Sequence, residues 1–133
     1  MGTKDSDPEL IHSRLDTVER YARVMGIPRM MAEVHELRSR LHLRSGDLRT
    51  AGTFARRSLE IASLHELQIR KARALILYAQ INFKRGFKKA CRSLLEEALG
   101  LTRDMGYFAA YAQAQELWHE LERTGSVEDS YVG

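Results

Sequence analysis

The chain has 133 residues, of which 44% are apolar and 29% charged, with a net charge of +3. This composition is ordinary for a globular domain and argues against disorder outside the chain ends. No apolar run approaches the roughly 18–20 residues of a membrane span, and the first residues lack the apolar core of a signal peptide. The single cysteine, Cys91, excludes an intrachain disulfide, so we expect a reducing, cytoplasmic setting.

The first two predicted elements are helices. Asp7-Pro8 predicts a helix start, with Asp as the N-cap and Pro at the first helical position. This helix should run to about Met25. The second should cover about 29–44 and end at the turn Ser45-Gly46-Asp47, where glycine suits a left-handed residue.

Four more helices are predicted by apolar residues at spacings of three and four, over about 48–64, 68–85, 88–105 and 107–123. The fourth is apolar on most of its circumference, so we expect it to be the most buried. The domain boundaries that follow are a disordered N-terminus at 1–7, a helical repeat domain at 8–123 and a flexible C-terminal tail at 124–133.

The chain repeats itself with a period of forty residues. The positions that coincide include Ala32, Ala72 and Ala112; Leu37, Leu77 and Leu117; Leu41, Ile81 and Leu121; and Gly46 with Gly86. A fixed period in this range predicts a solenoid, in which each unit buries its apolar face against its neighbours. It also makes the first, third and fifth helices equivalent to one another, and likewise the second, fourth and sixth.

The best-defined unit resembles the tetratricopeptide repeat (TPR). The positions that carry the resemblance are Leu75, Tyr78, Ala79 and Asn82 on one helix, and Cys91, Leu95 and Ala98 on the next. TPR units have roughly 34 residues and end in a proline, which Ser63 and Arg103 replace here, so the second helix can continue for another turn. The resemblance implies an all-α, TPR-like α-solenoid of about six antiparallel helices in a right-handed superhelix.

In the terms of that family, the second, fourth and sixth helices are A-type, and the first, third and fifth are B-type. The array therefore begins on a B-type helix and ends on an A-type helix. Either the two end helices are caps or the chain is a piece of a longer array, and we favour a fragment or small regulatory piece. Charged residues on both end helices, such as Arg14, Glu19, Glu116 and Glu120, suit exposed ends.

We find no motif for catalysis, a cofactor or a metal. The sequence His-Glu-Leu occurs at His35, His65 and His119, but none has the second histidine four residues later that a helical zinc site needs. Cys91 occupies a small packing position. His35 and His42 lie seven residues apart on one helical face, so they form either a pH-sensitive contact or, as we favour, half-buried structural contacts.

The TPR resemblance implies that exposed positions of the A-type helices bind a partner in a concave groove. The predicted partner-binding residues are Glu36, Leu37, Arg40, Arg44, Arg73, Leu77, Gln80, Phe83, Lys84, Leu117 and Glu120, with Glu33, Ile76 and Gln113 beside them. The three leucines, Leu37, Leu77 and Leu117, fit either the groove or the core, and we favour the core.

The charge distribution indicates what such a partner would be. Residues 36–92 carry fourteen Lys and Arg against four Asp and Glu, whereas 93–133 carry two against eight. We therefore predict a non-catalytic protein-interaction module, a scaffold or adaptor, whose partner is a protein or peptide, acidic or an amphipathic helix. The alternatives are a sensory or regulatory segment that self-associates head to tail, and a less favoured nucleic-acid binder through the basic centre.

Overall fold

The structure, a computed structural model, describes the backbone of residues 7–132 and the side chains as far as Thr124. Within that range the only regular elements are six helices, as predicted. They are α1 (Pro8–Met25), α2 (Pro28–Arg44), α3 (Leu48–Leu64), α4 (Gln68–Lys84), α5 (Lys88–Met105) and α6 (Phe108–Val132). The all-helical fold class is confirmed. None of the described helices is both long and apolar enough to cross a membrane.

Local sequence sets where the helices begin. The side chain of Asp7 accepts a hydrogen bond from the Glu9 amide at 3.0 Å, and Pro8 follows it at the first helical position. At the start of α3 the side chain of Asp47 accepts a hydrogen bond from the Thr50 amide at 3.2 Å. Hydrogen bonding from Thr50 lowers the pKa of Asp47, since it favours the charged carboxylate.

The turns follow the repeat. Residues with positive φ occur at Gly26, Gly46, Glu66, Gly86 and Gly106, one in each of the five turns between the described helices. The residue after each of them donates its amide to a carbonyl in the last turn of the preceding helix, as in the bond from Asp47 to His42 O at 2.9 Å. This arrangement satisfies carbonyl groups that the end of a helix leaves without an intrahelical partner.

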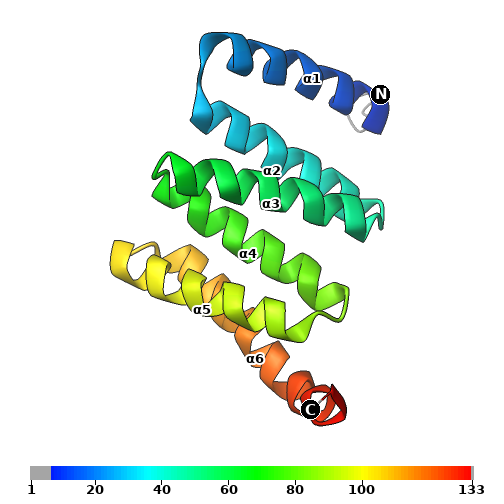
Figure 1. The fold of residues 1–133 in the computed structure, drawn as a ribbon, viewed down its shortest axis with the longest axis vertical. Helices are drawn as coiled ribbons and strands as arrows, with labels where there is room; N and C mark the ends of the chain where they lie inside the picture. Colours follow the sequence, from blue (N-terminus) through cyan, green and yellow to red (C-terminus); the bar gives the residue numbers. More distant parts are fainter. Residues whose placement is uncertain (1–6, 133) are drawn as a thin grey trace. The chain divides into compact units, whose positions relative to one another are not determined.

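The chain divides into two compact units, the first extending to Lys71 and the second beginning at Ala72. In the first unit, α1, α2 and α3 run antiparallel to their sequence neighbours (Figure 1). The α2–α3 pair is closely packed. Ser39 Oγ donates to Ala51 O at 2.7 Å, and Ser58 Oγ donates to Ala32 O at 2.8 Å. Small residues at these positions let the two helices approach each other closely.

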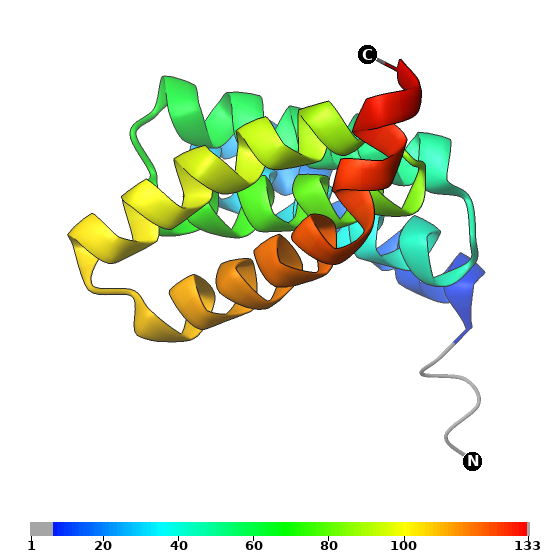
Figure 2. The ribbon, with the colours of Figure 1, turned by 90° about the horizontal axis from the view of Figure 1, so that it is seen from below.

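The second unit contains α4 from Ala72 onward, α5 and α6, which also run antiparallel in sequence order (Figure 2). Its largest fully buried side chains include Leu75, Leu77, Ile81, Leu95 and Leu121. From Ala72 onward the leucines, isoleucines and alanines of α4 are all buried, as expected for the most apolar helix.

The sixth helix differs from its predicted bounds, since α6 continues past residue 123 to Val132. Backbone in the predicted tail at 124–133 is thus helical as far as Val132, and Gly133 lies outside the described residues. The predicted disordered segment at 1–7 also lies outside them, apart from Asp7.

The outer face of α1 carries exposed apolar residues as well as the predicted charged ones. Val18, Tyr21 and Met25 are exposed to 38%, 54% and 58%, whereas the charged side chains of Asp16 and Glu19 reach Arg38 on α2. The predicted polar end helix therefore carries an apolar surface.

Candidate functional site

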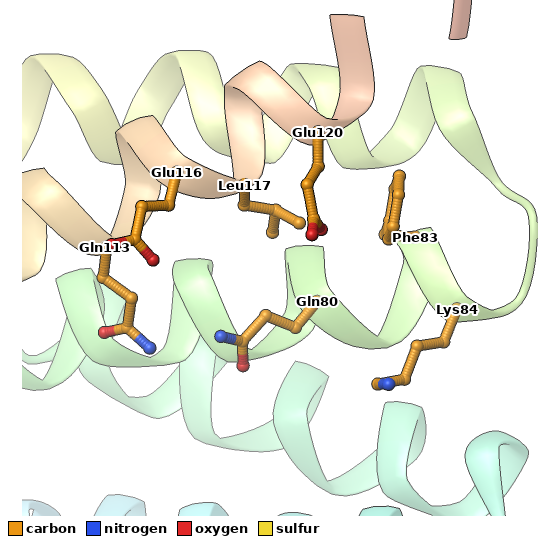
Figure 3. A pocket seen from close by; sticks show the side chains of 7 residues that line it. All are labelled: Gln80, Phe83, Lys84, Gln113, Glu116, Leu117 and Glu120. Carbon is orange, nitrogen blue, oxygen red and sulfur yellow. The ribbon is translucent and has the colours of Figure 1, made fainter. Parts of the chain in front are cut away.

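A cleft of about 660 Å³ lies between α4 and α6 in the second unit. Its lining is mixed apolar, amide and charged, and consists of Gln80, Phe83, Lys84, Gln113, Glu116, Leu117 and Glu120. In Figure 3, Leu117 and Glu120 extend from α6 toward α4, where Phe83 rises beside them. The cleft joins an apolar floor to a polar rim, which is the usual composition of a binding site.

The apolar part of the cleft is formed by Leu117 and Phe83. Leu117 is 8% exposed, so it is anchored in the fold and presents only its edge. Lys88 Nζ lies 4.6 Å from the centroid of the Phe83 ring, which is a cation–π contact. A partner side chain would therefore meet the exposed edge of Leu117 and the half-buried ring of Phe83.

The charged part of the cleft is acidic. Glu116 and Glu120 are exposed and line the α6 side, opposite the one lysine, Lys84. Arg123 Nη2 lies 3.9 Å from Glu120 Oε1 across exposed surface, and such a contact contributes about 1 kcal/mol or less. Among its lining residues the cleft therefore presents the carboxylates of Glu116 and Glu120 against the ammonium group of Lys84.

Helical spacing explains why these side chains meet. Gln113, Glu116, Leu117 and Glu120 stand at i, i+3, i+4 and i+7 and so share one face of α6. The predicted groove included every lining residue except Glu116. That residue was assigned to an outer polar face, although its spacing from Gln113 and Glu120 was sufficient to place it in the cleft.

The groove residues predicted in the first unit lie in a network of ion pairs. Glu36 is only 2% exposed. Its Oε2 lies 3.1 Å from Arg40 Nη2, and its Oε1 lies 3.6 Å from Arg70 Nη1. Arg70 also approaches Glu33, which accepts a hydrogen bond from Arg29 at 2.9 Å. The acidic and basic groups on this part of α2 therefore neutralise one another.

The structure separates the three equivalent leucines. Leu77 is 1% and Leu117 is 8% exposed, as favoured from the sequence, but Leu37 is 48% exposed and the core prediction is wrong for it. Burial of a helical position depends on which neighbour covers it, so one repeat position can differ between copies. Of the other predicted groove residues, Ile76 is buried, Arg73 is half-buried and Arg44 is exposed.

The paired histidines of α2 pack on one aromatic ring. The centroids of His35 and His42 lie 5.8 and 5.6 Å from that of Phe54, and His12 lies 5.1 Å from His42. Burial, followed by the charge of Arg57, lowers the pKa of His35, while Glu19 opposes this effect. Burial also lowers the pKa of His12, followed by the neighbouring His42 and Arg38.

The remaining candidates from the sequence are the thiol of Cys91 and the side chains that could bind a metal ion. Cys91 is fully buried, and burial raises the pKa of its thiol to about 11, so the thiol stays protonated. In the part of the chain that the structure describes, no group of three His, Cys, Asp or Glu side chains is arranged to hold a metal ion.

The basic centre is partly neutralised within the first unit. Arg38 is 7% exposed, and its Nη2 lies 2.6 Å from Asp16 Oδ1 and 3.1 Å from Glu19 Oε1. Together with Arg40 and Arg70, it belongs to the block that suggested an acidic partner. These contacts leave fewer arginines of the block available to a polyanion.

Comparison of the chain with protein families, with curated proteins and with solved structures finds no match. The TPR resemblance therefore stays a prediction from the residues that carry it.

Proposed function

We propose that the protein is a non-catalytic interaction module that binds a segment of a partner protein in the cleft between α4 and α6. The observation that carries the proposal is the cleft itself, where Leu117 and Phe83 form an apolar surface beside Glu116 and Glu120. A helical repeat offers such a surface between equivalent helices, which supports recognition rather than catalysis.

The lining indicates the chemistry of the segment. An apolar side chain of the partner would pack on Leu117 and Phe83, and a Lys or Arg nearby would pair with Glu116 and Glu120. The amides of Gln80 and Gln113 each offer both donors and an acceptor, which suits the main chain of a peptide. The proposed partner of this cleft is therefore basic and apolar, in place of the acidic partner expected from overall charge.

Selection from a phage-displayed library of random peptides tests this function. The wild-type protein should enrich peptides in which a Lys or Arg lies close to a large apolar residue. Replacing both exposed glutamates, Glu116→Lys with Glu120→Lys, should weaken binding of the enriched peptides by about tenfold or more, because a like charge replaces an opposite one.

The matched control is Glu60→Lys with Glu96→Lys, which makes the same change of charge on exposed positions of α3 and α5. This variant should bind the peptides as the wild type does. Enrichment of acidic peptides, no enrichment at all, or equal loss of binding in both variants would contradict the proposed site.

A further inference from the structure

The packing of α3 on α2 defines which face of a B-type helix an A-type helix covers. Along α3, Ala51 accepts the hydrogen bond from Ser39, Phe54 stacks on His35, and Ser58 donates to Ala32 O. One turn further, Ile61 lines a small apolar hollow together with Pro28 and Met31 of α2. The covered positions of α3 are therefore Ala51, Phe54, Ser58 and Ile61.

The equivalent face of α1 is left open. Forty residues earlier the same positions hold Ile11, Arg14, Val18 and Tyr21. Val18 is 38% and Tyr21 is 54% exposed, whereas Ala51 and Ser58 are fully buried. The opposite side of α1, with Leu15 and Ala22, is buried and faces α2. No A-type helix among the described residues covers this apolar surface of α1, whereas α2 covers its counterpart on α3.

The matching face of α6 is open as well. The α2 residues that contact α3 correspond on α6 to Phe108, Tyr111, Ala112, Gln115, His119 and Glu122. Phe108 is 76% exposed, and Ala112 is exposed although its equivalents Ala32 and Ala72 are fully buried. Ala112 thus differs from its repeat equivalents, because no B-type helix among the described residues covers it.

We propose that a second copy of this chain supplies the missing helix, with α1 of one copy packing on α6 of the other. If α1 of one copy packs on α6 of the other as α3 packs on α2, Tyr21 contacts Phe108 and Tyr111. In the same arrangement Val18 packs on the small Ala112. These are apolar and aromatic contacts between surfaces that are exposed in the single chain.

The charges on the two faces are complementary in the same register. Arg14 takes the place of Phe54, which contacts both His35 and His42. The corresponding residues of α6 are Gln115 and Glu122, so Arg14 meets an amide and a carboxylate. Glu122 Oε1 already lies 3.7 Å from His119 Nδ1 of its own helix, and an arginine would give it a partner whose charge does not depend on pH.

The order of helices favours a second copy as the occupant. Among the described residues, α1 leaves a B-type face uncovered and α6 leaves an A-type face uncovered, so a contact between copies keeps the alternation of helix types. Such a contact is head to tail, because two different surfaces meet. It is independent of the cleft between α4 and α6, so failure of one proposal leaves the other standing.

Sedimentation velocity over a concentration series tests the association. The wild type should assemble as concentration rises, whereas Tyr21→Glu and Phe108→Glu should each remain monomeric. Mixing these two variants should give a one-to-one pair and nothing larger, since each retains the face that the other has lost. Val24→Glu is the control, because Val24 is 78% exposed on α1 and its α3 equivalent Leu64 is 77% exposed. This variant should assemble like the wild type.

An exchange of charges tests the register. Arg14→Glu and Glu122→Arg should each weaken assembly by about tenfold, and the chain that carries both should recover it. Circular dichroism checks that the variants keep their helices. A wild type that stays monomeric, a mixture that does not pair, or a double variant no better than either single one would overturn the proposal.

Discussion

Glu66 occupies a backbone conformation that side chains other than glycine rarely adopt. Its φ is 55°, and it falls on the repeat position that Gly26 and Gly106 fill in the other two turns of this type. An L-residue in the left-handed region is destabilised by roughly 1–2 kcal/mol, because Cβ approaches the neighbouring carbonyl oxygen. The turn between α3 and α4 is therefore locally strained at Glu66, whereas the turns at Gly26 and Gly106 are not, because glycine adopts this conformation without strain.

Replacing this residue by glycine should stabilise the protein. Glu66→Gly relieves the local strain but makes the unfolded chain more flexible, so we expect a net gain of about 0.5–1 kcal/mol. Denaturant unfolding followed by circular dichroism measures it. The control is Glu60→Gly in the exposed interior of α3, which should destabilise by about 1 kcal/mol. Equal losses of stability in the two variants would contradict this account of the turn.

At the scale of elements, one hairpin geometry is built from two different sets of side chains. In α2–α3 the contact positions are polar or aromatic, as in Ser39, His35 and Ser58, whereas their equivalents in α4–α5 are Ala79, Leu75 and Ala98. All six are buried. The repeat therefore conserves the size and spacing of the contacts more closely than their polarity, and the first hairpin has the imidazole of His35 where the second has Leu75.

That group should make stability depend on pH. Since burial lowers the pKa of His35, the unfolded chain binds a proton more readily than the folded one. Stability should therefore be complete above the ordinary histidine pKa of 6.5 and fall as pH decreases through and below it. His12, whose pKa is lowered too, adds to the effect.

Denaturant unfolding at a series of pH values on both sides of 6.5 measures this dependence. His35→Leu, which copies the residue at the equivalent position Leu75, should give a shallower fall of stability toward acid pH. It also removes Nδ1, the buried side-chain atom for which the described residues provide no hydrogen-bond partner. His65→Gln, at an exposed histidine, should leave the pH dependence unchanged. An equally steep fall in His35→Leu would exclude His35 as its source.

At the scale of the whole molecule, self-association would couple assembly to stability. A partner that binds only the folded state raises the free energy of unfolding in proportion to the logarithm of its concentration. Here the partner is the chain itself, through Tyr21 on one copy and Phe108 on the next.

The thermal midpoint should therefore depend on protein concentration. Differential scanning calorimetry should give a Tm that rises as the wild-type concentration is raised, whereas the Tm of Tyr21→Glu should stay constant. Val24→Glu should follow the wild type. A constant Tm in the wild type would contradict assembly of the folded chain.

Most of the candidate cleft could be predicted before the structure was known. The period of forty residues made α4 and α6 equivalent, and the TPR resemblance placed Gln80, Phe83, Leu117 and Glu120 in the predicted groove, where they line the cleft. The sequence did not reveal that Arg70 joins the corresponding residues of α2. Glu36 and Arg40 lie four residues apart and meet within one helix, whereas Arg70 reaches Glu36 only because the start of α4 lies beside α2.

The sequence by itself determined the six helices, their order and nearly all of their ends, because caps, turn residues and helical periodicity act between residues close along the chain. Only the tertiary structure decided which equivalent positions are covered. Leu37 is exposed where Leu77 is buried, and Ala112 is exposed where Ala32 is buried. Exposure depends on which helix lies against a face, and equivalent positions of a repeat can differ in the neighbour that covers them.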